Sequence, residues 1–532
     1  MPSPFTRPVA MGPWWPAIAL LAISSLAFVH LLAIPVFEDE GSQIRWILRI
    51  IDAGEWLGPM GDGKPLEAWP MVPLVRLGLP AITVMRALHV LAGAIGAVLV
   101  YRIALRVLDW RASFVSAVLF SICPFVVYLQ RFALSDTFVC LAALAVALSL
   151  LRLTEQMRWR DAMLLGAGLV LGALAKLPVG FVLMIAAPLA LILMPPALRQ
   201  GLLRAPARTR LLAAHVPAVL LAAMIAGIAL VRVRRGQSPG FGLSDFLGVG
   251  LGRYRGIGAA TGTAHLTLAG ELAAQLSWPV LVIGAAGVAV GAALSDWRLR
   301  WLAASAAVPL LAIATLASFW FSRYLLFTLP PLIIVAVAGW CALAARARGS
   351  SRRGVRTLAR AALAALCGGC MVLMGHQSAL IVLDPTAASW SIVDRFQYFE
   401  GWSSGYGYPE AAAFLLSAPA APPRVLALDG HSAYQLRSYL PRDWLARVDS
   451  VDYGADGQPL RTDRARLENL LRVEPAWIII PEPLVQRYLE ASFGAGNQLE
   501  LRLIAAFDKP GGHTRLAIYQ VPGGAAKESS HD

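Results

Sequence analysis

The chain has 532 residues, of which 58% are hydrophobic and only 15% are charged. Soluble globular domains carry about 25% charged residues, so this composition excludes an ordinary water-soluble protein. The formal net charge of +14 does not indicate nucleic-acid binding, because most arginines lie in short connections between apolar blocks, where they set membrane topology. We therefore expect a helical membrane protein with no nucleic-acid partner.

The apolar residues occur in blocks of roughly twenty, the length with which an α-helix crosses a hydrocarbon core of about 30 Å. The first block lacks an obvious small-residue cleavage site and is interpreted as a retained helix. In chain order the blocks predict about eleven transmembrane helices, near residues 14–35, 80–101, 112–130, 134–151, 161–176, 178–195, 211–231, 272–294, 301–321, 324–344 and 361–383.

Arginines between the predicted spans decide their orientation, since cytoplasmic loops carry an excess of Lys and Arg. With the N-terminus inside, every inner connection is basic, near residues 102–111, 152–160, 199–210, 298–300 and 346–360. We therefore predict a multi-pass protein of a bacterial inner membrane, with a cytoplasmic N-terminus.

Two predicted outer connections are long. The first, residues 36–79, contains GSQIRWILRIIDAGEW, whose apolar residues recur at helical spacing and favour a helix lying in the membrane interface. The second, residues 232–271, is rich in Gly and Arg and includes Arg253 and Arg255. Basic residues there oppose the positive-inside bias, which favours an anionic ligand.

After Leu383 the composition changes to that of a soluble domain. Four β-like runs, RVLALD, AWIIIPEP, LRLIAAFD and TRLAIYQV, alternate with helical stretches, a pattern typical of an α/β domain. The predicted fold class is thus a polytopic α-helical membrane domain over residues 1–383 and an α/β domain over 384–532. An odd number of spans makes the second domain periplasmic.

Polar residues at the ends of the predicted spans gather on the outer face. Ionisable side chains at membrane depth are costly, so each needs a partner or a task. Lys and Arg at span ends also serve as interfacial anchors, and an acidic cluster can cap the helix that follows it. Asp136 is harder to explain as an anchor, because it abuts a long apolar run. The set comprises Glu38, Asp39, Glu40, Lys64, Asp136, Lys176 and Arg323.

Transfer of a sugar from a polyprenyl phosphate needs charges of both signs. Cations hold the phosphate and stabilise the charge that grows on it, and Lys64, Lys176 and the outer arginines are candidates. A carboxylate takes the proton of the acceptor hydroxyl, and Asp39 is the candidate for that role.

Four motifs in chain order resemble those of membrane glycosyltransferases of the C superfamily, in particular the protein O-mannosyltransferase and lipid A aminoarabinose transferase group. FEDEGSQIRWILRIIDAGEW followed by GDGKPLEAW resembles the first outer loop of that family, with Leu66 in place of a second proline. QRFALSD, LAKLPVG and SRYLLFTLPP are similar to later family motifs. The resemblance covers about the first 345 residues.

The resemblance implies an inverting transferase with a polyprenyl-phosphate sugar donor and an active site formed by Asp39, Glu40 and Asp136. It requires no cofactor, and a divalent metal, where one binds, is assigned to Asp39 and Asp136. Ser42 departs from the aminoarabinose transferases, which place an arginine there, and this argues against that substrate. The residues assigned to the donor phosphate are Lys64, Lys176, Arg45, Arg253, Arg255 and Arg323.

The segment GWSSGYGY, near the start of the C-terminal domain, resembles an element found in many bacterial members of the family. Trp402, Tyr406 and Tyr408 are candidates to stack on a sugar acceptor. The alternative is a Gly-rich turn that docks the domain onto the helical bundle.

Other functions stay open at this point. A transporter or flippase of lipid-linked saccharide would place polar residues near the midplane and show internal repeats, and the sequence has neither. A non-catalytic envelope assembly protein would leave Asp39, Asp136 and Lys176 unexplained. An oligosaccharide ligase or polymerase would use much the same chemistry. The acceptor is expected to be a lipid, a glycan or a protein.

Overall fold

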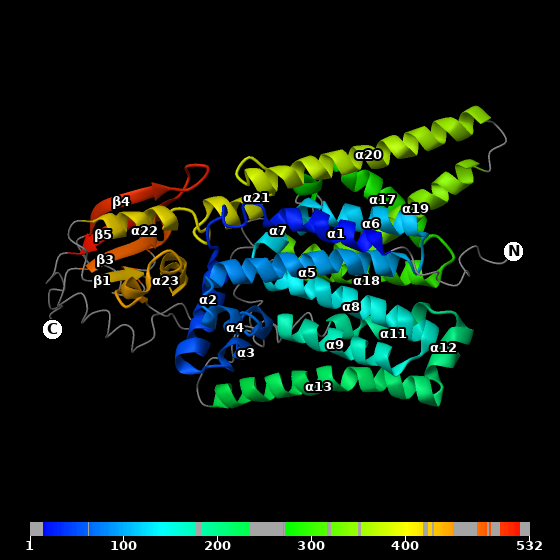
Figure 1. Ribbon diagram of the computed structural model, residues 1–532, viewed down its shortest axis with the longest axis horizontal. Coiled ribbons are helices and arrows are strands. Elements are labelled where there is room, and N and C mark those ends of the chain that lie inside the picture. The colour runs from blue at the N-terminus through cyan, green and yellow to red at the C-terminus, as the bar shows by residue number, and fades with distance from the viewer. Residues whose placement is uncertain are drawn as a thin grey trace. The chain divides into compact units, whose positions relative to one another are not determined.

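The computed structural model describes residues 14–61, 63–176, 182–234, 270, 272–316, 321–348, 353–418, 424–427, 430–450, 476–486, 489–490 and 501–521. The chain forms two compact units (Figure 1). The first unit comprises residues 1–31, 55–79 and 83–391, and the second comprises residues 32–54, 80–82 and 392–532. Residues 32–54, which include the start of the predicted first outer connection, therefore group with the C-terminal part of the chain.

Helices make up the first unit, and the apolar blocks of the sequence form the longest of them (Figure 1). Short elements connect several of these helices. The elements are α1 (Trp15–Ser25), η1 (Leu26–Phe28), α3 (Gly58–Gly61), η2 (Pro65–Glu67), α4 (Val72–Arg76), α5 (Ala81–Ala104), α6 (Trp110–Ser121), α7 (Pro124–Arg131), α8 (Ser135–Gln156), α9 (Trp159–Ala175), α11 (Ala186–Leu193), α12 (Pro196–Leu203), α13 (Ala205–Arg234), α17 (Trp278–Ala292), α18 (Trp297–Leu316), η3 (Ser322–Thr328), α19 (Leu329–Arg348) and α20 (Arg353–Leu383).

A helix lies at each of the eleven predicted spans, but fewer helices meet a test of length and apolarity by themselves. Within the described ranges, five helices are long and apolar enough to cross a membrane. A sixth span results if α6 and α7, which are bent by 53° at their break, cross as one. A helical protein with several candidate membrane-spanning helices is thus confirmed, and the count of eleven stays a prediction.

Two buried arginines hold the chain just after the first helix. Arg131, at the end of α7, is fully buried and donates hydrogen bonds to the carbonyl oxygens of Val29 at 2.6 Å and His30 at 2.7 Å. Arg86 of α5 is 1% exposed and donates to the carbonyl of Leu31 at 3.0 Å. Buried guanidinium groups need such acceptors, so Arg131 stabilises this turn instead of snorkelling toward the interface.

The second unit contains a five-stranded sheet with the order β2-β1-β3-β5-β4. Strand β1 is parallel to β2 and β3, whereas β5 is antiparallel to both β3 and β4. Four strands coincide with the four β-like runs of the sequence, and the short β2 was not predicted. The elements are α2 (Glu38–Ala53), α21 (Ile392–Arg395), η4 (Phe396–Glu400), α22 (Tyr408–Ser417), β1 (Arg424–Ala427), α23 (Gly430–Arg437), α24 (Arg442–Leu445), β2 (Val448–Ser450), β3 (Ala476–Pro481), η5 (Glu482–Leu484), β4 (Arg502–Asp508) and β5 (Arg515–Val521).

Helix α2 is the amphipathic helix that the apolar spacing predicted. Ile44, Ile47 and Ile50 lie on its buried face and are at most 5% exposed, and α2 packs against α23 of the same unit. The helix ends at Gly54, whose φ of 69° is the left-handed conformation that glycine adopts without a steric penalty. The apolar face of α2 is thus partly covered by the C-terminal residues.

Candidate functional site

Asp136 lies at the centre of a charged cluster in the first unit. It occupies the first turn of α8, where the helix dipole favours a carboxylate, and is 5% exposed. Its Oδ1 lies 3.1 Å from Nζ of Lys176, and its Oδ2 lies 4.0 Å from Nε of Arg323. One carboxylate therefore faces two cations. The cluster keeps a net positive charge, which suits an anionic ligand.

Aromatic rings surround the cations of this cluster. Nζ of Lys176 lies 4.0 Å from the ring centroid of Tyr324. The guanidinium of Arg323 lies 4.5 Å from the ring centroid of Phe321 and 5.8 Å from that of Tyr324. Ring quadrupoles stabilise a cation without neutralising it, so both groups keep their charge for a ligand.

Lys176 and Arg323 both lie on backbone that is not α-helical. Lys176 follows the last residue of α9 with extended φ and ψ of −159° and 106°, and Arg323 belongs to the 3₁₀ segment η3 that precedes α19. Non-helical backbone at membrane depth is tolerated only where protein buries it or a cavity borders it. Both cations near the start of α8 therefore lie on non-helical backbone that needs such an environment.

A third lysine comes from the motif GKPLEAW. Lys64 is half-buried and precedes η2, a short turn that packs against both α8 and α9. Lys64 thus comes from an element next to the helices that carry Asp136 and Lys176. Glu67 of the same turn is 1% exposed, and the sequence analysis did not single it out. Its only signal was its place inside the matched motif.

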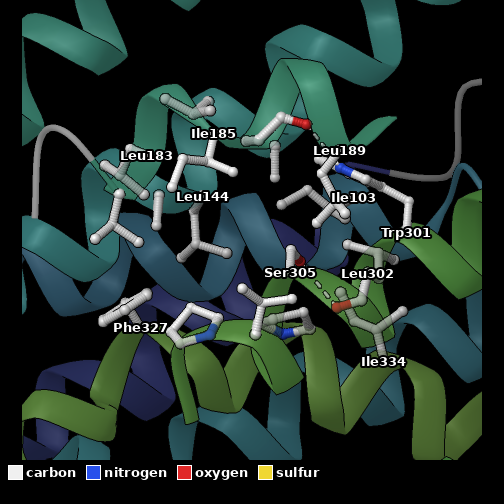
Figure 2. A pocket seen from close by; sticks show the side chains of 18 residues that line it. Ile103, Leu144, Leu183, Ile185, Leu189, Trp301, Leu302, Ser305, Phe327 and Ile334 are labelled. Atoms are coloured by element: carbon white, nitrogen blue, oxygen red, sulfur yellow. Dashed lines mark hydrogen bonds between the residues drawn. The ribbon is translucent and has the colours of Figure 1, made fainter. Parts of the chain in front are cut away.

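An apolar pocket opens among the helices of the same unit. Figure 2 shows it lined by side chains of α5, α8, α11, α18, η3 and α19. Its empty volume is about 730 Å³, open mouth included. The two polar groups at its wall bond locally: Trp301 Nε1 donates to the carbonyl of Ala186 at 3.0 Å, and the Ser305 hydroxyl donates to that of Leu302 at 2.8 Å. The pocket therefore suits a hydrocarbon ligand.

The pocket shares two elements with the charged cluster. Leu144 lies eight residues beyond Asp136 on α8, which is roughly 12 Å along the helix axis. Phe327 lies four residues beyond Arg323 on η3. A molecule with an anionic head and an apolar tail would find both features within the first unit.

Glu40 and Asp39, both in the first turn of α2, differ in their burial. Glu40 is fully buried, and its Oε2 accepts a hydrogen bond from the backbone N–H of Phe37 at 2.9 Å, which caps α2. Asp39, in the same first turn, is half-buried. The guanidinium of Arg45 lies 4.9 Å from the ring centroid of Trp46 and 5.5 Å from that of Tyr434. A capping role thus accounts for Glu40 and leaves Asp39 as the candidate base.

The aromatic candidates near residue 400 differ in their surroundings. Tyr408 is fully buried and donates a hydrogen bond from its hydroxyl to that of Ser432 at 2.6 Å. The expectation that Tyr408 stacks on an acceptor is therefore wrong, because it packs in the core of its own unit. Trp402 is 39% exposed, and Tyr406 is half-buried beside Phe399. Arg253 and Arg255 lie outside the described residues.

The residues around Asp136 do not fit a divalent metal. Metal sites of this type combine several carboxylate, imidazole or thiolate ligands, whereas the ion-pair partners of Asp136 are a lysine and an arginine. Nowhere in the described ranges do three or more such ligands come together.

Comparisons with known proteins agree with this architecture. Residues 62–230 match the family described as dolichyl-phosphate-mannose-protein mannosyltransferase. No curated protein matches the sequence significantly. ArnT from Cupriavidus metallidurans, solved bound to undecaprenyl phosphate, superposes with a TM-score of 0.56 at 15% identity, over 97% of this chain and 100% of that one.

An archaeal protein shares the fold over a smaller part of its length. The oligosaccharyltransferase of Archaeoglobus fulgidus, solved with Zn and sulfate, gives a TM-score of 0.53 at 12% identity over 82% of this chain. This chain spans 62% of that protein's length. Another structure of that enzyme, AglB, contains an inhibitory peptide and a dolichol-phosphate, and gives a TM-score of 0.51 at 11% identity over 87% of this chain and 69% of that one.

The chain thus shares its fold with ArnT and with the archaeal oligosaccharyltransferase. The family match and this fold confirm the resemblance to the membrane glycosyltransferases of the C superfamily.

Proposed function

We propose that the protein transfers a sugar from a polyprenyl-phosphate-linked donor to a lipid, glycan or protein acceptor. One observation carries this proposal: Asp136, Lys176 and Arg323 form a net-positive cluster, and the elements that carry Asp136 and Arg323 also line an apolar pocket. A polyprenyl phosphate has a matching structure, with an anionic head on a long hydrocarbon chain. Two proteins of the same fold were solved with undecaprenyl phosphate and dolichol-phosphate, respectively.

The proposed chemistry divides the work between one carboxylate and several cations. Asp39 takes the proton of the acceptor hydroxyl as its oxygen attacks the anomeric carbon, and the bond from that carbon to the phosphate oxygen breaks. Lys176, Arg323 and Lys64 stabilise the charge that develops on the leaving phosphate. Asp136 orients the first two of these cations. Attack opposite the leaving group inverts the anomeric configuration.

The proposed location is the outer face of a bacterial inner membrane. The opposite end of α8 and the loops beyond it carry the arginines that predict a cytoplasmic side. In this orientation Asp136 faces the periplasm, and the C-terminal unit is periplasmic as well.

The deciding experiment compares two neighbouring carboxylates of α2. We expect Asp39→Asn to reduce transfer about 10²–10⁴-fold, the usual contribution of a general base, whereas Glu38→Gln keeps most of the activity. Membrane fractions supplied with radiolabelled polyprenyl-phosphate hexoses and pentoses would measure this, with equal amounts of inserted protein. Unchanged turnover in Asp39→Asn would remove Asp39 from the mechanism.

The rival function has its own readout. Proteoliposomes that equilibrate a fluorescent lipid-linked saccharide across the bilayer, with no sugar transferred to any acceptor, would indicate a flippase instead.

A further inference from the structure

Side chains of the C-terminal residues hold the backbone that leads into Asp39. The N–H of Val36 donates to the hydroxyl of Tyr439 at 2.6 Å, and the carbonyl of Val36 accepts from Nε2 of Gln435 at 3.0 Å. Two residues later, the N–H of Glu38 donates to the carbonyl of Ser403 at 3.2 Å. Both backbone groups of Val36 are thus bound by residues about four hundred positions away in the chain, all within the second unit.

Gln435 donates hydrogen bonds both to Val36 and to the loop that contains Ser403. Its Nε2 also donates to the carbonyl of Ser403 at 3.1 Å, and the residue is 1% exposed. Helix α23, which carries Gln435, approaches α2 closely: a Cβ atom at Gly41 would lie 3.2 Å from the backbone nitrogen of Gln435. A glycine two residues after Asp39 therefore allows the contact that places Gln435 beside Val36.

Lys509 fixes the loop that supplies the Ser403 carbonyl. This lysine follows β4 and is 2% exposed, and its Nζ donates to the carbonyls of Gly401 and Ser404, both at 2.9 Å. A buried ammonium is costly unless hydrogen bonds satisfy it, so the loop and the lysine hold each other in one arrangement. The GWSSGYG loop thus has a defined task within its own unit.

We propose that Gln435, Tyr439 and Lys509 are positioning residues for the base Asp39, which makes the C-terminal unit part of the catalytic apparatus. The inference rests on the proposed function of Asp39. A displacement of about 1 Å at a reacting group can cost roughly 100-fold in rate, and side chains that lock the backbone next to it prevent such a displacement.

Two variants test the proposal by separating kcat from KM. We expect Gln435→Leu to lower kcat about 10–100-fold and Tyr439→Phe, which removes one hydroxyl, about 3–10-fold, with the donor KM unchanged in both. Arg515→Gln is the matched control, because it breaks an ion pair with Glu482 in the same unit. We expect Arg515→Gln to leave kcat unaltered.

Hydrogen exchange supplies a readout that does not depend on activity. In the full-length protein in detergent, Tyr439→Phe should speed exchange of the Val36 amide, measured by mass spectrometry of peptides covering residues 33–44. Slow exchange in this variant, an unchanged kcat in Gln435→Leu, or an equal loss of kcat in Arg515→Gln would each overturn the positioning role. If Asp39→Asn left transfer unchanged while Tyr439→Phe still gave fast exchange, Asp39 would not be the base. The hydrogen bonds that Gln435 and Tyr439 make to Val36 would nevertheless be supported.

Discussion

Helix α8 carries an ionic cluster at each end, and the two clusters are built differently. At its start, Asp136 faces Lys176 and Arg323, whose cations also lie over aromatic rings. Near its other end, Glu155 pairs with Arg106 and lies 3.9 Å from Arg298. The helix has 22 residues, so the clusters are separated by roughly 30 Å.

The far cluster has the character of an anchor. Arg152 and the fully buried Asp161 form a close pair with Nε and Oδ1 2.9 Å apart, and Arg210 donates to the carbonyl of Met157. These residues lie at the ends of helices and in the short connections between them. The positive-inside bias and ordinary helix-end bonding account for them.

The cluster at Asp136 shows features that anchoring does not require. Both of its cations come from irregular backbone, and each lies within 4.5 Å of the centroid of an aromatic ring. We infer that the same residue types have different roles at the two ends, because the local backbone and the aromatic neighbours of the cations differ. Six substitutions would sharpen or break this contrast.

Neutralising the carboxylate at each end of α8 should give the largest difference in transfer rate between two matched variants. We expect Asp136→Asn to reduce transfer about 100-fold or more, because Lys176 and Arg323 lose the charge that orients them. Glu155→Gln should change transfer by less than about 2-fold, since exposed ion pairs contribute little. Initial rates at matched amounts of inserted protein would measure both, and equal losses would contradict the distinction between the ends.

Removing one cation from each end should have a smaller but still unequal effect. Lys176→Met keeps the aliphatic chain and removes the charge, so we expect the donor KM to rise about 10-fold or more, as for a lost charge-assisted hydrogen bond. Free polyprenyl phosphate should inhibit this variant less strongly. Arg106→Met is the control and should leave the donor KM unchanged; a comparable rise there would favour a general electrostatic effect.

The sequence predicted the helices and the gathering of charges at span ends for identifiable physical reasons. Twenty-residue apolar blocks and basic connections are local patterns, and they place Asp136, Lys176 and Arg323 at one end of the bundle before any coordinates are known. The structure brings these three side chains together. Their roles in transfer remain proposals.

Contacts between distant segments could not be predicted in the same way. Gln435 and Tyr439 bind Val36 across about four hundred residues, and no spacing in the sequence encodes such a contact. Tyr408 looked like a surface aromatic because it lies in a Gly-rich loop, yet its hydroxyl finds a buried partner in Ser432. Tyrosine is satisfied in a core whenever its hydroxyl is bonded, so loop composition alone does not decide its exposure.

We expect substitution of Lys64 to affect donor binding less than substitution of Lys176. Lys64 is half-buried and precedes η2, which packs against α8 and α9. In the proposed role, its charge would act on a bound phosphate through partly solvated space. We expect Lys64→Ala to weaken donor binding about 2–5-fold, and the loss should shrink at high salt because solvent ions screen such charges. A donor dependence that stays unaltered at low salt would count against a phosphate role for Lys64.

The smallest expected effect concerns a surface pair of the C-terminal unit. Arg515 donates two hydrogen bonds to Glu482, at 2.8 and 2.6 Å, and the hydrogen bond from Arg515 lowers the pKa of the Glu482 carboxyl in the folded protein. The pair therefore stabilises the fold above the ordinary glutamate pKa of 4.5, and this contribution is lost as pH falls through the lowered folded-state pKa.

In Arg515→Gln, we expect the melting temperature to depend less on pH between about pH 3 and 6 than in the wild type. Transfer at neutral pH should change little, because exposed pairs contribute little. Thermal unfolding of wild type and variant in the same detergent would measure it. If the variant instead lost transfer activity at neutral pH, this pair would behave like the Asp136 cluster. Irregular backbone and close aromatic rings would then no longer distinguish charges that act in transfer from charges that only stabilise the fold.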